Sequence, residues 1–284
     1  MNPPDILPGQ SEALLKALHI LTREGRLNQD SRRKLKQVNH LFQFIRPLLE
    51  ALHASNPTFT IVDHGAGKSY LGFILVDLYL KSMAPDAQVI GIERREDLVK
   101  AAQALADDAG FHQMRFLAIQ AQEAIQSELL PAQVGMVTAL HACDTATDDA
   151  IAFGIARHAD YIVVVPCCQA EVASALRQAK RPYDSDPFSE LWRRPIHTRE
   201  FGSHLTNTLR CLQLEAHGYQ VTVTELVGWE HALKNELMIA TRKGKPQAKP
   251  AQKLQAILDR VGIPALAQRF FVPTELASTH EQSP

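Results

Sequence analysis

A short glycine-containing segment offers the clearest chemistry in the sequence. Asp63, Gly65 and Gly67 follow an apolar run at 59–63 and precede a helical pattern at about 68–82. Glycines between a strand and a helix let the backbone turn tightly and approach a ligand, and the first N–H groups of the helix can bind that ligand. The segment therefore indicates a nucleotide or nucleoside site, with a plain helix-capping turn as the alternative.

Two familiar nucleotide-binding motifs do not fit this segment. A GxxxxGK[ST] phosphate loop would use Gly67, Lys68 and Ser69, but its first glycine would fall at Val62, inside the strand. A GxGxxG dinucleotide motif would place its third glycine at Tyr70, a large side chain where close packing is needed. The remaining pattern is an acid followed by two spaced glycines. It suits a ligand that carries a cation and no pyrophosphate.

A second acid ends the next apolar run. Glu93 closes the run at 88–93. An acidic side chain at the tip of a second strand is placed to accept hydrogen bonds from ribose hydroxyls. Glu93 therefore supports an adenosine-containing ligand without naming it. The alternative is a surface glutamate that begins the next helix, with Arg94 and Arg95 as solvated neighbours.

Polar side chains also gather after two later apolar runs. His141, Cys143 and Asp144 follow one run, and Cys167 and Cys168 follow the next. Because ligands bind at the carboxyl ends of strands in open parallel sheets, we expect all five residues to face the site that holds the first two acids.

Three kinds of chemistry fit this cluster. His141 and the three cysteines could hold a structural zinc, although two adjacent cysteines and the lack of CxxC spacing disfavour it. One activated cysteine could form a covalent intermediate. Alternatively, the cysteines pack as small buried residues beneath the ligand. We favour packing and predict no metal. We expect His141 and Asp144 to position the substrate or to remove a proton.

The elements that must position these residues alternate between strand and helix. Apolar runs at 59–63, 88–93, 114–119, 135–142 and 159–166 are separated by helical patterns at about 68–82, 96–110, 121–129 and 145–158. This alternation predicts an α/β fold with a parallel sheet and helices on both faces. Two more runs, at 219–227 and 235–242, follow a helix at about 199–217 and should pair antiparallel. The whole plan is that of a Rossmann-like methyltransferase sheet, five parallel strands plus an antiparallel terminal pair.

Three segments flank or interrupt this plan. Residues 1–57 are predicted to form an N-terminal helical extension, with helices at 11–27 and 31–54. The stretch after Pro166 is predicted to form a surface loop of about thirty residues without regular structure. Residues 58–243 then form the catalytic domain, and residues 244–284 form a linker and a C-terminal helical tail.

The motifs together resemble a known group of enzymes. The pattern Asp63-x-Gly65-x-Gly67 is similar to motif I of Rossmann-like S-adenosylmethionine-dependent methyltransferases. The pair LHACDTATDDAI and VPCCQ resembles the family that includes the glutathione S-transferase C-terminal domain-containing protein, and a similar pair occurs in a eukaryotic tRNA 2′-O-methyltransferase. A later EHxxKN block, at 230–235, resembles bacterial members.

The resemblance implies a cofactor and roles for individual residues. The cofactor would be S-adenosyl-L-methionine, with Asp63 near the cationic end of its methionine moiety. Gln120, which follows the third strand, would read the adenine amino group, unless it simply starts a helix. Asp144 stands where the family typically has glycine.

Composition limits the acceptor and the compartment. The formal net charge of the 284-residue chain is −1, so a polyanion would need a local basic patch. Four cysteines without a spaced disulfide framework, and no secretory or membrane-spanning pattern, favour the cytoplasm. We expect RNA as the acceptor, and the alternatives are a protein side chain, a small molecule, or a cofactor-binding partner subunit without catalysis. The expected RNA-binding residues lie mainly on the helix at 31–54 and are Arg32, Arg33, Lys34, Lys36 and Arg46, with Arg193, Arg194 and Arg199 as additions.

Overall fold

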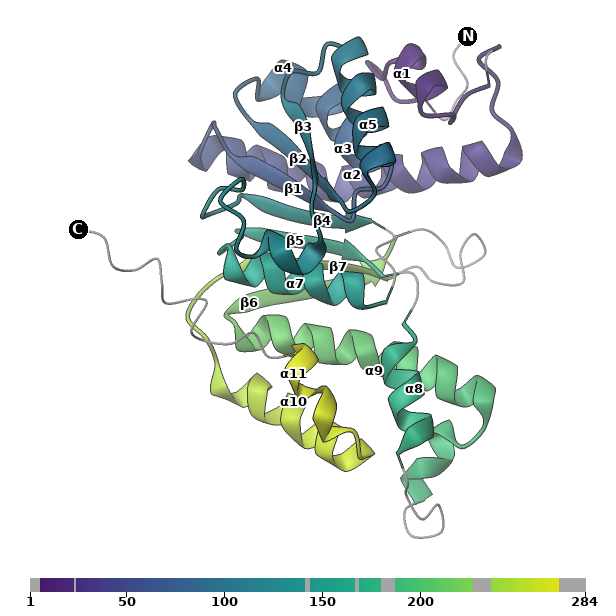
Figure 1. Cartoon of the computed structure of the whole chain (residues 1–284), viewed down its shortest axis with the longest axis vertical. Coiled ribbons are helices and arrows are strands. Elements are labelled where there is room, and N and C mark those ends of the chain that lie inside the picture. Colours follow the sequence, from purple (N-terminus) through teal and green to yellow (C-terminus); the bar gives the residue numbers. More distant parts are fainter. Residues whose placement is uncertain are drawn as a thin grey trace, which may run out of the picture.

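A mixed sheet of seven strands organises the chain (Figure 1). The computed structural model describes residues 6–22, 24–140, 144–166, 169–179, 187–226 and 236–270. Strand order is β3-β2-β1-β4-β5-β7-β6. The first five strands pair in parallel, and β7 is antiparallel to both β5 and β6. The predicted fold, a Rossmann-like sheet with an antiparallel terminal pair, is confirmed.

The strands are short, and most of their residues are buried, as a sheet covered on both faces requires. Their bounds are β1 (Thr60–His64), β2 (Gln88–Glu93), β3 (Met114–Ala118), β4 (Met136–Leu140), β5 (Tyr161–Val165), β6 (Tyr219–Glu225) and β7 (Glu236–Arg242).

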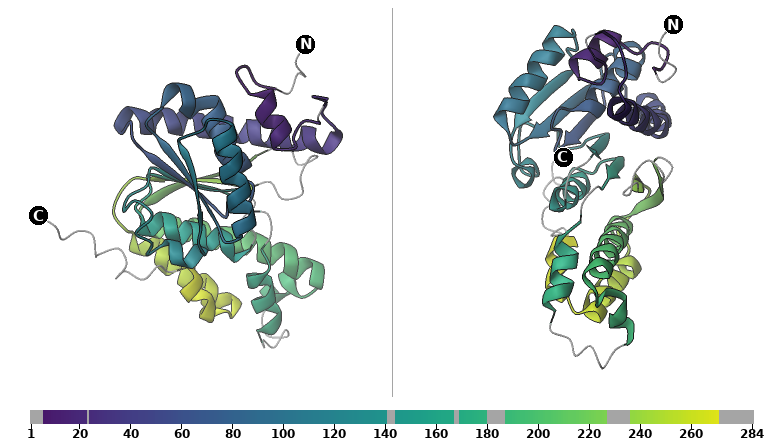
Figure 2. Two further views of the ribbon diagram at one scale, coloured as in Figure 1. Left: turned by 45° about the horizontal axis from the view of Figure 1, so that its top comes forward. Right: turned by 90° about the vertical axis from the view of Figure 1, so that its right-hand side faces the viewer.

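Helices pack on both faces of the sheet (Figure 2). On one face, α1 (Glu12–Ala17), α2 (Gln29–Ser55), α3 (Tyr70–Leu75), the π-helical turn η1 (Val76–Leu80), α4 (Lys81–Met83) and α5 (Glu96–Asp108) surround a core that includes Ile61. On the other face, α6 (Ala121–Ala124), α7 (Thr145–Ala156) and α9 (Pro195–Ala216) surround a core that includes Val62.

A third apolar cluster joins the C-terminal helices to α9. It contains side chains from α8 (Glu171–Gln178), the 3-10 turn η2 (Pro187–Trp192) and α10 (Ala248–Val261), including Leu176, Trp192, Leu209 and Leu258. The chain continues into the 3-10 turn η3 (Pro264–Leu266) and α11 (Ala267–Phe270). In α11, Arg269 donates two hydrogen bonds to the carboxylate of Glu171, at 2.9 and 3.0 Å, which ties the helix to α8.

Several predicted boundaries are wrong. The first helix ends at Ala17 and does not reach residue 27, because His19 and Gly25 adopt positive φ angles of 58° and 78° that a helix cannot accommodate. The stretch after Pro166 contains regular structure, namely α8 and η2, and α9 begins at Pro195. The linker expected at the start of 244–284 has only a few residues, since α10 starts at Ala248.

The N-terminal segment is tied to the rest of the fold by buried polar contacts. Asp77, in the π-helical turn, accepts hydrogen bonds from the Ser11 backbone N–H at 2.7 Å and from Lys81 Nζ at 2.6 Å. Gln10 donates to Asn39 of α2 at 3.1 Å. These contacts fix α1 against α2 and the helix that follows β1. Within the described ranges, no helix is both long and apolar enough to cross a membrane.

Candidate functional site

The predicted ligand-binding residues meet at the carboxyl edge of the parallel strands. Strand order reverses between β1 and β4, and in open α/β sheets ligands bind at such a switch point. Asp63 and Glu93 occupy the ends of β1 and β2, Gln120 follows β3, and Asp144 follows β4. The topology therefore brings four separate segments of the sequence to one edge.

The loop after β1 has the backbone geometry that its glycines predict. Gly65 and Gly67 have positive φ angles of 67° and 57°, and Ser69 follows in the left-handed region at 49°. The Ala66 N–H donates to the carbonyl of Ile92 at 2.9 Å, so the loop lies against the end of β2. A Cβ added at Gly67 would meet no atom within 4 Å, so the loop presents bare backbone to open space.

Asp63 is buried beneath this loop. Its two carboxylate oxygens accept hydrogen bonds from the hydroxyls of Ser69, at 2.8 Å, and Thr138, at 3.0 Å. Thr138 is its neighbour on β4 in the sheet register. Burial raises the pKa of Asp63 to about 6, although the two hydrogen bonds oppose the shift. A nearby cation would favour the ionised form of this carboxyl group.

Glu93 connects the glycine loop to the end of β2. One carboxylate oxygen accepts the Gly67 N–H at 3.0 Å, and the other accepts the backbone N–H and the Nε of Arg95, both at 3.0 Å. Burial raises the pKa of Glu93, but the hydrogen bonds and charge of Arg95 and the bond from Gly67 outweigh burial, and the pKa lies below its ordinary value. Glu93 is therefore an ionised hydrogen-bond acceptor beside the loop.

Gln120 stands in front of α6, at the end of β3. Its side chain is exposed, and its backbone N–H donates to the carboxylate of Glu123 at 3.3 Å. This contact makes Gln120 the N-cap of α6. The structure thus places Gln120 at the predicted edge, and its contact with adenine stays a prediction.

The predicted catalytic pair is described only in part. Asp144 precedes α7, and its Oδ1 accepts the backbone N–H groups of Ala170 and Glu171 at 2.9 and 3.3 Å. His141 lies outside the described residues, as do Cys143, Cys167 and Cys168. No three His, Cys, Asp or Glu side chains in the described ranges could together hold a metal ion, and the zinc alternative stays untested.

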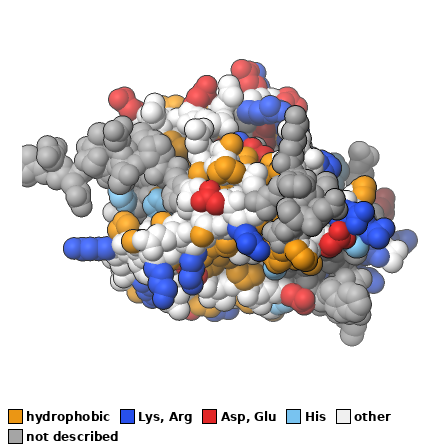
Figure 3. Space-filling model, turned by 90° about the horizontal axis from the view of Figure 1, so that it is seen from below, with side chains coloured by type: hydrophobic (Ala, Val, Ile, Leu, Met, Phe, Trp, Pro, Cys, Tyr) orange, Lys and Arg blue, Asp and Glu red, His pale blue; other side chains and the backbone are white. Residues whose placement is uncertain are grey.

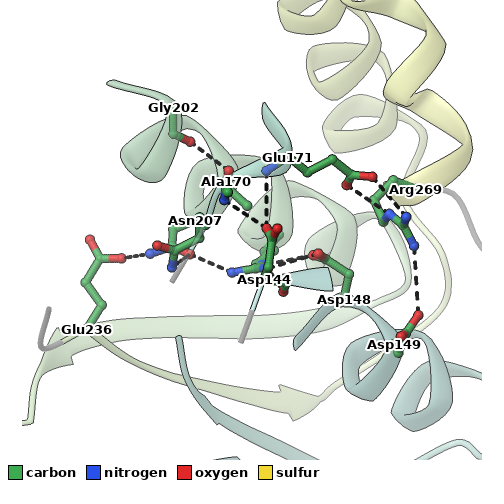
Figure 4. A network of polar contacts seen from close by, with 12 residues as sticks. Asp144, Asp148, Asp149, Ala170, Glu171, Gly202, Asn207, Glu236 and Arg269 are labelled. Atoms are coloured by element: carbon green, nitrogen blue, oxygen red, sulfur yellow. Dashed lines mark hydrogen bonds and ion pairs between the residues drawn. The ribbon is translucent and has the colours of Figure 1, made fainter. Parts of the chain in front are cut away.

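A buried polar network lies beside Asp144 (Figure 4). Arg210 of α9 is fully buried and donates from Nε and Nη2 to the two carboxylate oxygens of Asp148, at 2.7 and 2.9 Å. Its Nη1 donates to Asn207 at 3.1 Å, and Asn207 donates to Glu236 at the start of β7. The network joins α7 to α9 and to the last strand.

Sequence patterns did not identify Ser69, Thr138 or Arg210 as partners of the site. The one available signal was a charged residue on an otherwise apolar helical face, which applies to Asp148 and Arg210. His64 was also missed. It is buried against Phe153, and burial lowers its pKa to about 4.

The sequence matches a known protein family over half its length. Residues 33–175 match the family described as "Methyltransferase domain", a segment that contains the glycine loop, Glu93 and the ends of β3 and β4. The chain belongs to this methyltransferase family. The match runs from the second helix to α8, so it includes most of the parallel sheet.

Curated relatives of this methyltransferase are much longer proteins. It is 31% identical over 150 residues to the glutathione S-transferase C-terminal domain-containing protein of Mus musculus, and 27% identical over 182 residues to that of Bos taurus. These matches cover 52% and 64% of the methyltransferase but 21% and 25% of the relatives. The chain thus aligns with about a quarter or less of each relative.

The comparison with solved structures gives matches of low sequence identity. The magnesium protoporphyrin IX methyltransferase of Synechocystis, with bound SAH, is 14% identical, with a TM-score of 0.44 over 81% of this chain and 94% of that one. An rRNA methylase from Streptococcus thermophilus is 9% identical, with a TM-score of 0.41 over 66% and 89% of the two chains.

A hollow of about 680 Å³ lies at the edge of the sheet opposite the glycine loop. Its lining includes Thr60 and Tyr161, which begin β1 and β5, and Arg242, which ends β7. The hollow is therefore separated from the glycine loop by the length of the strands.

Proposed function

We propose that this methyltransferase binds S-adenosyl-L-methionine at the carboxyl edge of its sheet and transfers a methyl group to RNA. The observation that carries the cofactor assignment is that Asp63 and Glu93 both accept hydrogen bonds from the loop after β1, which faces open space at Gly67. Two carboxylates next to bare backbone suit a ligand with a ribose and an ammonium group.

The chemistry of these residues fits the proposed cofactor. Glu93 has one further acceptor position for a ribose hydroxyl, on the oxygen that accepts the Gly67 N–H, because each oxygen of a carboxylate can accept two hydrogen bonds and the other oxygen already accepts two from Arg95. Asp63 supplies negative charge beneath the loop, which favours a cation and disfavours a phosphate. Gln120, at the end of β3, would face the adenine. Bound there, S-adenosyl-L-methionine supplies an electrophilic methyl group on a sulfonium.

The remaining task of the protein is alignment. A methyl group moves in line between donor and acceptor, so catalysis depends mainly on aligning the acceptor atom with the methyl group and the sulfur that carries it. The acceptor would approach beside the ends of β4 and β5, next to the site of the cofactor, where His141 follows β4. A role for His141 in removing a proton from the acceptor belongs to this proposal.

The position of α2 supports a polyanionic acceptor. The helix has 27 residues and is therefore about 40 Å long, whereas the five residues of β1 span about 17 Å. Its C-terminal end lies at the amino edge, since Leu52 is next to Gly135 in front of β4. Its N-terminal half therefore projects past the carboxyl edge, as Figure 1 shows.

The projecting half of α2 is the basic one. Arg32, Arg33, Lys34 and Lys36 are exposed there, within the first two turns. A second group of cations, Arg193, Arg194 and Arg199, is exposed around the start of α9, at the same edge. Phosphates could thus contact two sides of the proposed active site. Figure 3 shows the lower face of the molecule, away from α2, where Lys and Arg side chains are scattered among acidic and apolar ones.

Binding and transfer assays test the two parts of the proposal. Calorimetry with S-adenosyl-L-methionine, its demethylated product, ATP and NAD should give binding for the first two alone. Labelled methyl transfer to total RNA and to total protein from cells lacking the gene should then label RNA. Tight NAD binding without a response to the methionine cofactor would overturn the cofactor assignment, whereas label in protein alone would overturn the RNA assignment.

A further inference from the structure

Asp144 adopts a backbone conformation that side chains rarely accept. Its φ and ψ angles are 50° and −120°, a region used almost only by glycine. The residue sits in the turn between β4 and α7, at the acceptor side of the proposed site. A non-glycine residue persists in such a conformation only where its surroundings hold it there.

Two groups of contacts hold Asp144. On the side-chain side, Oδ1 accepts the N–H groups of Ala170 and Glu171, the residues that start α8. On the backbone side, the carbonyl of Asp144 accepts a hydrogen bond from Nη2 of Arg210 at 2.9 Å. Because ψ sets the direction of this carbonyl, the bond from Arg210 fixes the angle that costs energy.

Arg210 is itself unable to move away. It is fully buried and makes a bidentate ion pair with Asp148 one turn further along α7. Asn207 accepts from Arg210 and from Gln169, at 3.1 and 3.2 Å, and Gln169 follows β5. The turn after β4, the turn after β5 and α9 are therefore linked through neighbouring hydrogen bonds.

We propose that Asp144 and Arg210 are positioning residues that hold the start of α7 and the start of α8 together at the acceptor side of the active site. Asp144 acts through its cap on α8, and neither contacts the substrate nor removes a proton, the two roles that the sequence suggested. Arg210 acts through the carbonyl of Asp144. This inference rests on the proposed function only in taking that edge as the acceptor side.

Three substitutions of Asp144 separate the roles of its oxygen, charge and strain. Asp144→Asn keeps an oxygen that can cap α8 and removes the charge. Asp144→Gly removes the cap but adopts the same backbone angles without strain. Asp144→Ala removes the cap and keeps the strain. A base would be lost equally in all three variants, whereas the cap survives in the asparagine variant.

The assay uses whichever extract, total RNA or total protein, the wild-type enzyme labels. We expect the methyl-transfer rate of Asp144→Asn to fall less than threefold. The rate of this variant should also decrease at low pH in the same way as that of the wild type. Asp144→Ala and Arg210→Met should each lose at least tenfold, with the affinity for S-adenosyl-L-methionine unchanged in calorimetry. Equal loss in Asp144→Asn and Asp144→Ala would overturn the inference.

Hydrogen exchange gives a second readout that needs no acceptor. The N–H groups of Ala170 and Glu171 should stay protected in Asp144→Asn and lose at least tenfold of their protection in Asp144→Ala. Equal protection in both variants, each folded by circular dichroism, would show that Asp144 does not stabilise the start of α8.

In the transfer assay, label in protein alone would refute the RNA acceptor and still leave the positioning role measurable.

Discussion

At the scale of single residues, Asp63, which we propose to be near the ligand, has a cost in stability. Its folded-state pKa of about 6 lies above the ordinary value of 3.8 because the carboxyl group is buried. The folded protein therefore binds this proton more tightly than the unfolded chain does, so the free energy of unfolding falls as pH rises from about 4 to about 6. The difference between these two pKa values corresponds to about 3 kcal/mol.

Asp63→Asn should consequently be more stable than the wild type above pH 6, by up to about 3 kcal/mol, and equally stable near pH 4. The same variant should bind S-adenosyl-L-methionine more weakly, because it no longer offers a negative charge to the ammonium group. Urea unfolding at pH 4–8 and calorimetry at pH 7.5 would measure the two effects. A stability difference that does not change with pH would contradict this explanation.

Glu93 allows a test with a closely matched control. Glu93→Ala removes a charged acceptor from the ribose and from Gly67, a class of contact worth about 1.5–3 kcal/mol, or about 10- to 100-fold in affinity. Arg95→Ala removes the neighbouring cation and leaves the carboxylate in place. Calorimetry should therefore show a large loss for Glu93→Ala and less than a threefold change for Arg95→Ala. Similar losses in both would mean that the carboxylate does not contact the ligand.

The positions of these acids at strand ends could be predicted from the sequence, whereas their partners could not. Asp63 and Glu93 each end a short apolar run, and the carboxyl ends of parallel strands must share an edge. Thr138 lies opposite Asp63 only because of the register between β1 and β4. Such a contact joins residues 75 positions apart, and no local pattern encodes it.

At the scale of elements, the helices between Pro166 and α9 show where local patterns were insufficient. The residues of α8 form a single short amphipathic stretch, followed by prolines and charged residues that resemble a loop. Its buried face, including Val172 and Leu176, packs on α9 within the third apolar cluster. The helix is thus stabilised by tertiary packing, which a short sequence window does not contain.

The contact between α8 and α9 makes Gly202 sensitive to substitution. An added Cβ would lie 2.7 to 2.9 Å from three atoms of Ala173, two of them in the backbone. Gly202→Ala should therefore force the helices apart and destabilise the protein by about 1–3 kcal/mol. Gly244→Ala is a matched control, because its Cβ would meet no atom within 4 Å.

Chemical denaturation of the two glycine variants would measure this difference directly. Gly202→Ala should also reduce methyl transfer more than cofactor affinity, because α8 starts at the residues that Asp144 caps. If both variants unfold at the same denaturant concentration, the packing of α8 against α9 is looser than the structure indicates.

At the scale of the whole molecule, charge distribution decides how RNA could bind. The net charge of −1 provides no general attraction, so association must depend on the local cations that α2 carries past the carboxyl edge. The helix itself was predictable from its apolar spacing. Its overhang was not, because it depends on where the C-terminal end of α2 packs against the sheet, with Leu52 next to Gly135 in front of β4.

If RNA binds through these cations, the salt dependence of its affinity should report the number of phosphate contacts. Each phosphate contact with single-stranded RNA contributes about −0.7 to the slope of log affinity against log salt concentration. Removing three of them in Arg32/Arg33/Lys36→Ala should reduce the slope by about 2 and weaken binding at 50 mM salt far more than at 300 mM. The control variant Lys245/Lys249/Lys253→Ala removes the same charge from exposed positions at or before α10. Its slope should match the wild type. Equal slopes for both variants would mean that the overall charge, and not the projecting end of α2, governs the encounter with RNA.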